Sequence, residues 1–386
     1  MGRVVGIICE YNPFHKGHKY QIDKIKSIEN GATVIAIMSG NIVQRGEFAI
    51  IDKYSRAKMA LECGIDAVFE LPYPYSGSTA EIFASAGVEL AYRVGCDAIY
   101  FGTELLSLEE LERVASAVDS AEFETEINDL LKDKSIGYIG AKEKALERLG
   151  VDLPQSANDM LGVEYIRAIK KMGKDIEYHT VQRVGSFYND ERVGNIMSAG
   201  AIRKSFYKTN SFASVPLEAM PIYDEVLANG RYLNLSYVND FLQTYTLLNS
   251  ERISSAFDTT EEMVALIKEK SKNSKDFITD LSSKAFTNSR LKRTVLYSLF
   301  EIENVDFALG FTVLLGMNKK GQAHINKIKK NDGFYIITKH SDGKDMPNDL
   351  KAQLEKLYYV DSVYNTLMVK KLKPSEAFRN KPIITE

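Results

Sequence analysis

The sequence has few of the residues that cross-link a chain or hold a metal ion, and it has no long hydrophobic run. It contains three cysteines, five histidines and no tryptophan. The odd number of cysteines, each in an apolar setting, predicts reduced core thiols of a cytoplasmic protein instead of disulfides. The histidines at positions 179, 324 and 340 lack the spacing of metal ligands, so we expect no metal held by the protein.

The hydrophobic pattern of the sequence also predicts no transmembrane segment and no targeting segment. No apolar run approaches the roughly 20 residues that a membrane helix needs. The apolar stretch near the N-terminus is shorter than a signal peptide requires and reads as a strand. Internal repeats and low-complexity segments are absent. With 45% apolar and 26% charged residues over 386 positions, the composition predicts a soluble globular protein of one to three domains without a membrane partner.

The chain as a whole has little excess charge, but the charge is unevenly distributed. Residues 284–386 hold 18 Lys and Arg against 11 Asp and Glu, whereas the whole chain holds 49 and 52. A basic C-terminal third on an acidic protein points to a polyanionic partner, and the alternative is an ordinary lysine-rich surface. The candidate contacts for such a partner are Arg290, Lys292, Arg293, Lys327, Lys329 and Lys330.

Strand and helix patterns alternate over the first 210 residues. The expected strands are Val4–Cys9, Ala32–Met38, Asp66–Leu71, Asp97–Phe101 and Ile176–Arg183, with helices at about residues 18–30, 52–63 and 79–94 and a helical stretch over 107–172. This alternation predicts an α/β fold with a doubly wound parallel sheet. The segment Ile42–Ile51 reads as too polar for the core. From about Met220 onward we expect mostly helices, with a short strand at Phe334–Thr338 and a last helix at Gln353–Leu372.

The stretch His15–Lys16–Gly17–His18 lies between the first strand and the first helix. Free N–H groups and the positive end of the helix dipole meet at such a point and favour an anion. Both imidazoles can reach it, and Gly17 has no Cβ to block a phosphate. In a doubly wound sheet this is where nucleotide phosphates bind. The alternative is a polar turn without chemistry.

The string HKGH after a first strand resembles the (H/T)xGH signature of the nucleotidylyltransferase superfamily. The longer string GIICEYNPFHKGH, together with SGNIVQRGEF, resembles the bacterial tRNA(Met) cytidine acetate ligase family. The resemblance covers most of the chain and is clearest over residues 1–210. It implies activation of acetate by ATP to acetyl-AMP with release of pyrophosphate. The acetyl group would then pass to N4 of the wobble cytidine, position 34, of elongator tRNA(Met), with Mg²⁺ accompanying ATP.

The resemblance also assigns residues and domains. It implies an ATP-binding catalytic domain at 1–210 and a basic, mostly helical, tRNA-binding region at 211–386. His15 and His18 would be catalytic. The ATP contacts would be Ile7, Ile8, Cys9, Glu10, Tyr11, Asn12, Pro13, Phe14, Lys16, Gly17, Lys19 and Tyr20 around them, with Gly102, Asn158 and Arg183 further on.

A second phosphate contact rests on a partial match. The stretch SAGAIR resembles the SSTxIR motif of the superfamily, with Ala199 and Gly200 in place of the usual hydroxyl residues. Ser198 could cap a helix and bind a phosphate oxygen, and Arg203 could neutralise the β- and γ-phosphates. Simpler alternatives exist throughout: a strand-end turn for Gly102, a helix cap for Asn158, a surface charge for Arg183, and a capped helix with an exposed Arg203.

Three hypotheses about function follow. The favoured one is the tRNA cytidine acetate ligase. A small-molecule adenylyltransferase explains HKGH equally well but needs no basic helical extension. The third is a non-catalytic RNA-binding protein whose nucleotidyltransferase fold has lost its activity. This hypothesis does not explain the intact His15, Gly17 and His18. The sequence predicts no particular oligomeric state.

Overall fold

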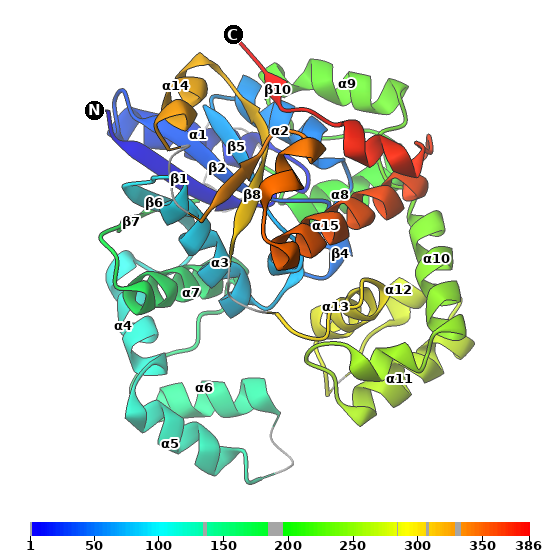
Figure 1. Ribbon diagram of the computed structural model, residues 1–386. Helices are drawn as coiled ribbons and strands as arrows, with labels where there is room; N and C mark the ends of the chain where they lie inside the picture. Colours follow the sequence, from blue (N-terminus) through cyan, green and yellow to red (C-terminus); the bar gives the residue numbers. More distant parts are fainter. Residues whose placement is uncertain (1, 134–136, 184–195, 284, 306–308, 329–332) are drawn as a thin grey trace.

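A mostly parallel sheet forms the centre of the molecule (Figure 1). The computed structural model describes residues 2–133, 137–183, 196–283, 285–305, 309–328 and 333–386. The strands are β1 (Val4–Cys9), β2 (Thr33–Ser39), β5 (Ala67–Leu71), β6 (Ala98–Thr103), β7 (Glu177–Gln182), β8 (Phe311–Met317), β9 (Tyr335–Ile337) and β10 (Ile383–Ile384). Their order is β10-β8-β5-β2-β1-β6-β7, and β9 also pairs with β8. The predicted α/β fold is confirmed.

The connections between the strands fix where a ligand can bind. β1 pairs in parallel with β2 on one side and with β6 on the other. From β1 the chain therefore adds β2 and β5 on one side of the sheet, and then crosses back to add β6 and β7 on the other side. The carboxyl end of β1 is thus a topological switch point, at which open parallel sheets leave a crevice for ligands.

Helices cover the sheet and extend beyond it. The first half contains α1 (Lys16–Ile28), α2 (Lys53–Glu62), α3 (Ala80–Arg93), α4 (Leu108–Val118), α5 (Ala121–Leu130), α6 (Tyr138–Arg148) and α7 (Ala157–Met172). The second half contains α8 (Ala199–Thr209), α9 (Met220–Ala228), α10 (Leu235–Leu248), α11 (Glu261–Asn273), α12 (Phe277–Asp280), α13 (Asn288–Leu299), α14 (Lys319–Ile328) and α15 (Asn348–Leu367). No helix in the described ranges is long and apolar enough to cross a membrane.

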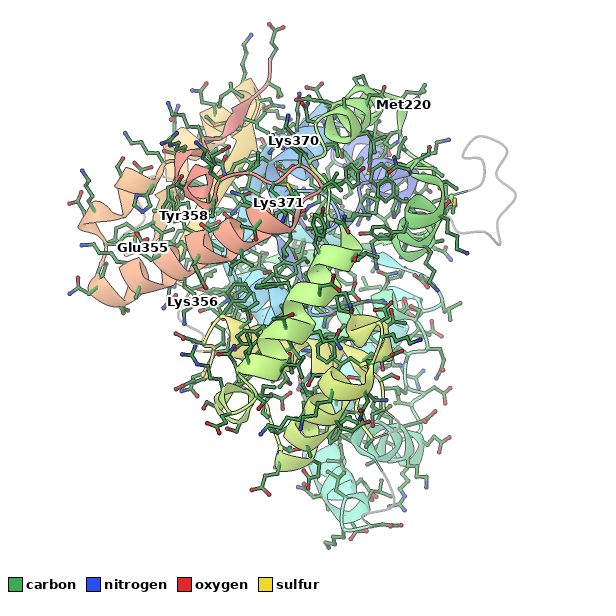
Figure 2. All side chains as sticks on the ribbon, turned by 90° about the vertical axis from the view of Figure 1, so that its right-hand side faces the viewer. Met220, Glu355, Lys356, Tyr358, Lys370 and Lys371 are labelled. Atoms are coloured by element: carbon green, nitrogen blue, oxygen red, sulfur yellow. The ribbon has the colours of Figure 1, made fainter. Side chains whose placement is uncertain are left out.

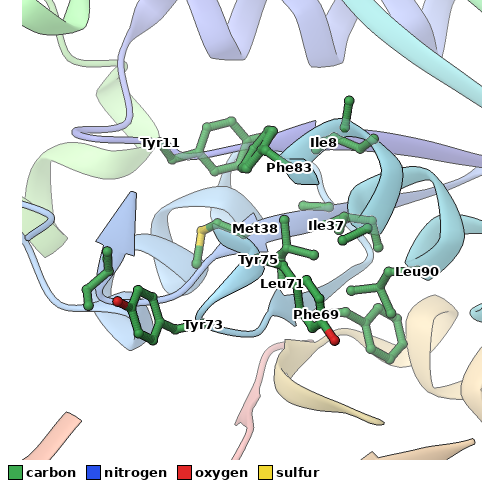
Figure 3. Close-up of a cluster of buried hydrophobic side chains, with 14 of the residues drawn as sticks. Ile8, Tyr11, Ile37, Met38, Phe69, Leu71, Tyr73, Tyr75, Phe83 and Leu90 are labelled. Atoms are coloured by element: carbon green, nitrogen blue, oxygen red, sulfur yellow. The ribbon is translucent and has the colours of Figure 1, made fainter. Parts of the chain in front are cut away.

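The core lies between the sheet and α3. Figure 3 shows Phe83 and Leu90 of α3 in one cluster with Ile8, Ile37 and Phe69 of three neighbouring strands. All five side chains are buried. The strands read as nearly continuous apolar runs because helices cover both faces of a parallel sheet.

The C-terminal region returns to the sheet, which the sequence did not predict. β8 runs antiparallel to β5, and β10 then pairs in parallel with β8. The expectation of mostly helices after Met220, with a short strand at Phe334–Thr338, is confirmed, and β9 is that strand, but β8 and β10 were not predicted. A short apolar run such as 311–317 cannot be assigned by periodicity, and its partner strand lies about 240 residues away. The sheet thus includes strands from both sides of the predicted domain boundary at residue 210, which itself stays a prediction.

The segment Ile42–Ile51 is mostly core, contrary to expectation. It forms a hairpin of β3 (Ile42–Val43) and β4 (Glu47–Phe48). Phe48 packs against Phe300 and Tyr364, with ring centroids 6.4 and 6.2 Å away. The polar residues that suggested exposure occupy only the turn and one face of the hairpin, and tertiary contacts bury the rest.

Three element boundaries also differ from the prediction. α1 begins at Lys16, so the last three residues of HKGH lie inside the helix instead of before it. β6 extends to Thr103, which places Gly102 within the strand, opposite Val181. α15 covers residues 348–367, because its start follows Pro347 instead of the later apolar residues.

A buried ion cluster joins α15 to the sheet. Lys53, Glu70 and Asp361 are each at most 3% exposed. The Lys53 Nζ lies 2.7 Å from Glu70 Oε2 and 2.6 Å from Asp361 Oδ2. Burial raises the pKa of Glu70 to about 7, although the Lys53 charge opposes this shift. The cluster attaches the last long helix to the strand next to β2.

Candidate active site

The His15–His18 turn caps the first helix with its own side chains. His15 is the N-cap of α1, and its Nδ1 accepts a hydrogen bond from the Gly17 N–H at 3.0 Å. In return, the Nδ1 of His18 accepts one from the His15 N–H at 3.2 Å. The two rings stack with their centroids 3.7 Å apart. The spacing of the motif thus forms a capping box in which both cap groups are imidazoles.

This capping arrangement determines the tautomer of each ring. A neutral imidazole has one donor and one acceptor nitrogen, and Nδ1 is the acceptor in both residues. The proton of each ring is therefore on Nε2. The Nε2 of His15 is buried and has no hydrogen-bond partner among the described residues. The turn thus holds two stacked N–H donors, and one of them is buried without a partner.

Burial keeps both rings neutral. It lowers the pKa of His15 from 6.5 to about 3, with a smaller contribution from the Arg183 charge. Burial also lowers the pKa of His18 well below its usual value, assisted by His15 and Arg183. Near neutral pH the rings therefore act as hydrogen-bond donors without a positive charge.

The neutral His15 makes folding pH-dependent. The unfolded chain protonates near pH 6.5 and the folded protein only near about 3, so the unfolded state binds more protons between these values. The stabilisation is complete above pH 6.5 and is lost as the pH falls toward 3. We expect the free energy of unfolding to decrease through this residue by up to about 1.4 kcal/mol per pH unit.

Urea unfolding at about pH 7 and about pH 5 measures this loss, and His15→Asn is the matched variant because Asn also caps helices but does not titrate. We expect the variant to lose less stability between the two pH values than the wild type does. Equal losses in both proteins would contradict the assignment of a strongly lowered pKa to His15.

A buried arginine holds the strand ends beneath the turn. Arg56 is 0% exposed. Its guanidinium donates to the carbonyls of Glu10 and Ser39 at 2.5 and 3.0 Å, and to those of Gly40 and Ile51 at 2.5 and 2.9 Å. These carbonyls follow β1 and β2 or end the hairpin. One side chain therefore fixes the backbone where β1 and β2 end.

The predicted contacts around the motif fall into two groups. The side chains of Ile7, Ile8, Tyr11 and Phe14 are buried in the core, so only their backbone is available to a ligand. Polar groups in the same stretch bind the hairpin: Glu10 Oε1 accepts from the Gln44 N–H at 2.8 Å, and Asn12 Oδ1 accepts from the Ile50 N–H at 2.9 Å. Lys19 pairs with Asp23 at 2.6 Å.

Helix α8 approaches the turn from the second half of the chain. Ser198 is its N-cap and accepts from the Ala201 N–H at 3.2 Å, as predicted. Arg203 donates to the Asn12 carbonyl at 2.6 Å, which places its guanidinium beside the turn that precedes HKGH. The Lys16 N–H also donates to the Ser214 carbonyl at 2.9 Å. Residues 184–195, which precede α8, lie outside the described residues.

A second cluster forms at the carboxyl ends of β6 and β7. Arg183 Nη1 donates to Glu104 Oε1 at 2.9 Å, and Asn158 Nδ2 donates to the same oxygen. A Cβ on Gly102 would lie 3.1 Å from Arg183 Cγ. The N-cap of α7 is Ser156, so Asn158 is not the helix cap that one alternative predicted. The structure therefore brings Gly102, Asn158 and Arg183 together.

Sequence reasoning missed Glu104 in this cluster. The only available signal was an acidic residue two positions after the glycine at a strand end. Its importance depends on Asn158 and Arg183, which are 54 and 79 residues away. No local pattern brings these three residues together.

The predicted basic contacts are partly engaged within the protein. Arg290 pairs with Asp258 at 2.7 Å, and Lys292 pairs with Glu47 at 2.7 Å. Arg293 is 8% exposed and donates to the Gln44 carbonyl at 3.3 Å. Lys327 is exposed. Lys329 and Lys330 lie outside the described residues.

Comparison with known proteins agrees with this geometry. A parallel sheet with neutral donors at the switch point defines a nucleotide-binding α/β protein, and the model of the HIGH Nucleotidyl Transferase family matches residues 2–379. The tRNA(Met) cytidine acetate ligase of Thermosipho africanus is 34% identical over 97% of this chain and 94% of its own length. That of Listeria monocytogenes is 34% identical over 99% of this chain and 100% of its own.

Solved structures agree as well. Thermotoga maritima TmcAL bound with alpha-thio ATP has a TM-score of 0.87 and 28% identity, covering 99% of both chains. The apo form of that protein has a TM-score of 0.89 and 29% identity. The chain therefore belongs to the HIGH Nucleotidyl Transferase family and, within it, to the tRNA(Met) cytidine acetate ligases.

Proposed function

We propose that this protein uses ATP to activate acetate and then acetylates N4 of the wobble cytidine of elongator tRNA(Met) in the cytoplasm. The observation that carries the proposal is the pair of neutral Nε2–H donors of His15 and His18 at the N-terminus of α1. Family membership supports the same activity, and the alpha-thio ATP complex of the Thermotoga maritima relative supports ATP as the nucleotide.

The first step is displacement at the α-phosphate of ATP. An acetate oxygen bonds to the phosphorus, the bond to the β-phosphate bridging oxygen breaks, and pyrophosphate leaves with that electron pair. His15 and His18 donate hydrogen bonds to the oxygens on which negative charge accumulates. Lys16 and Arg203 stabilise the leaving pyrophosphate, and the dipole of α1 adds to this field. The protein mainly positions the reactants and stabilises the developing charge, because no covalent intermediate with the protein is needed.

The second step transfers the acetyl group. The N4 amine of cytidine attacks the carbonyl carbon of acetyl-AMP, the carbon–oxygen bond to the phosphate breaks, and AMP leaves. The amine loses one proton in forming the amide. Both steps use one nucleotide site, so we place Gly102, Asn158 and Arg183 beside the adenosine part of ATP and Ser198 beside its phosphates.

Mg²⁺ belongs to ATP in this proposal and not to a site on the protein. Among the residues that the structure describes, no group of three His, Cys, Asp or Glu side chains could hold a metal ion. Mg²⁺ usually keeps several waters and binds through substrate phosphates with one or two carboxylates, and not in a cage built by the protein alone. We therefore expect Mg²⁺ to enter with the phosphates of ATP.

We propose that tRNA contacts the region 211–386, in which the excess of basic residues lies from residue 284 onward. Figure 2 shows Lys356, Lys370 and Lys371 on one face of the molecule. The Lys371 Nζ lies 4.7 Å from the centre of the Tyr237 ring. Within the described ranges, neither Lys370 nor Lys371 pairs with a carboxylate, so both cations are available to phosphates. Arg290, Lys292 and Lys327 stay as further proposed contacts.

The variant Lys370→Ala/Lys371→Ala tests this surface. Loss of two phosphate contacts is expected to raise the Kd for tRNA(Met) about tenfold and to reduce the salt dependence of binding by about one unit of slope per lysine. Filter binding at several salt concentrations measures both. Lys144→Ala, on the exposed face of α6, is the control and should bind like the wild type. An unchanged Kd and slope in the double variant would remove these lysines from the interface.

Nucleoside mass spectrometry tests the whole proposal. An elongator tRNA(Met) transcript is incubated with the protein, ATP, Mg²⁺ and acetate. We expect one cytidine to gain the mass of one acetyl group, and no gain when ATP or acetate is omitted. Pyrophosphate release without acetylation would favour an adenylyltransferase with another acceptor. Neither product would leave a nucleotide-fold binding protein.

A further inference from the structure

Glu104 lies between two proposed ATP contacts, and hydrogen bonds hold both its side chain and its backbone. Its Oε1 accepts hydrogen bonds from Arg183 Nη1, at 2.9 Å, and from Asn158 Nδ2. Its backbone is fixed as well, because the carboxylate of Asp159 accepts from the N–H groups of Glu104 and Leu105 at 2.8 and 3.0 Å. Asp159 is 0% exposed. The fold therefore holds this carboxylate in place from both its main chain and its side chain.

We propose that Glu104 is a positioning residue for ATP that acts through Asn158 and Arg183. The inference rests on the proposed function, since that function assigns these two residues to the nucleotide. Asn158 directs its Nδ2 toward Glu104, so its Oδ1 remains to accept a hydrogen bond from the nucleotide. The ion pair holds the Arg183 guanidinium at the end of β6, where Gly102 leaves room for it.

Loss of the Glu104 carboxylate has two opposing effects on ATP binding. It would release the charge of Arg183 for the phosphates, which favours binding. It would also let two side chains sample rotamers that must be given up when ATP binds, which opposes binding. The Arg183 and Glu104 side chains are 35% and 39% exposed, so water screens the pair and the first effect is small. The ordering effect therefore dominates, and ATP should bind more weakly.

The variant Glu104→Gln tests this prediction. In acetate-dependent ATP–pyrophosphate exchange, we expect the KM for ATP to rise about tenfold while kcat stays within about threefold of the wild-type value. Glu109→Gln is the matched control, because Glu109 is an exposed glutamate five positions further on. It should leave both constants unchanged.

Exchange of the two side chains separates positioning from a general structural role. Asn158→Asp places two carboxylates against each other and is expected to raise the KM for ATP by more than about tenfold. Adding Glu104→Gln to it restores an N–H···O bond with the roles reversed. The double variant should therefore bind ATP more tightly than Asn158→Asp alone, a non-additive result that mere loss of folding stability would not produce.

Calorimetric titration with ATP alone keeps this inference distinct from the proposed function. A wild-type protein that binds ATP but shows no acetate-dependent exchange would overturn the proposed function, and the Glu104 effect would then be read from the Kd for ATP. A Glu104→Gln protein whose KM and Kd for ATP both stay within twofold of wild type would overturn the inference. So would a double variant whose loss is the product of the two single losses.

Discussion

Replacing His18 by alanine is expected to slow acetate-dependent ATP–pyrophosphate exchange by about 100- to 1,000-fold. The ring is neutral, and its Nε2–H is directed by the hydrogen bond that Nδ1 accepts from the His15 N–H. In the proposed mechanism, alanine removes a donor that acts on charge developing at the α-phosphate. The folded state loses one hydrogen bond worth about 1 kcal/mol, so the variant should stay folded.

The control for this variant is His340→Ala. His340 is a partly exposed histidine far from the turn in sequence, and its Nε2 lies 2.8 Å from Glu355 Oε1. It should exchange pyrophosphate like the wild type and unfold at nearly the same urea concentration. Wild-type exchange rates in a folded His18→Ala protein would remove this ring from the mechanism.

Replacing Lys53 by methionine is expected to lower the free energy of unfolding by about 3–5 kcal/mol. The ammonium of Lys53 stands between the carboxylates of Glu70 and Asp361, and all three groups are buried. Methionine nearly fills the volume but leaves two buried carboxylates without a cation. Urea denaturation monitored by circular dichroism measures the loss.

Lys58→Met provides the comparison, because it breaks an exposed ion pair on the same helix. Lys58 lies 2.8 Å from Glu225, and their side chains are 39% and 51% exposed. This change should cost no more than about 1 kcal/mol. If the two variants were equally stable, the buried cluster would not be what attaches α15 to the sheet.

The parts of the fold that sequence reasoning predicted are those specified by local chemistry. The strand Val4–Cys9 agrees with its predicted bounds, and the helix behind Asp52 begins where its cap indicated. In both cases the signal lies within a few residues: a β-branched apolar run, and a capping side chain. The HKGH string likewise marked the turn between strand and helix, although it did not reveal that the helix begins at Lys16 or that His15 is its cap.

The predictions failed where distant partners decide the structure. The segment 42–51 was predicted to be exposed from its polar residues, but Phe48 packs against Phe300 and Tyr364 in the core. The sequence of β8 shows only a short apolar segment, and its pairing with β5 is what makes it a strand. Basic residues also looked alike in the sequence, yet Arg293 is buried whereas Lys327 is exposed. Sequence composition counts charges, but only packing shows which of them face water.

The sequence by itself determined the α/β class and the turn that carries the two imidazoles, because each depends on contacts within one strand, turn or helix. Only the tertiary structure decided that both rings carry their proton on Nε2, since burial and the capping bonds set this state. It alone also placed Glu104 between Asn158 and Arg183. A site at a sheet edge collects residues from several strand ends, and their proximity follows from strand order, which no local pattern encodes.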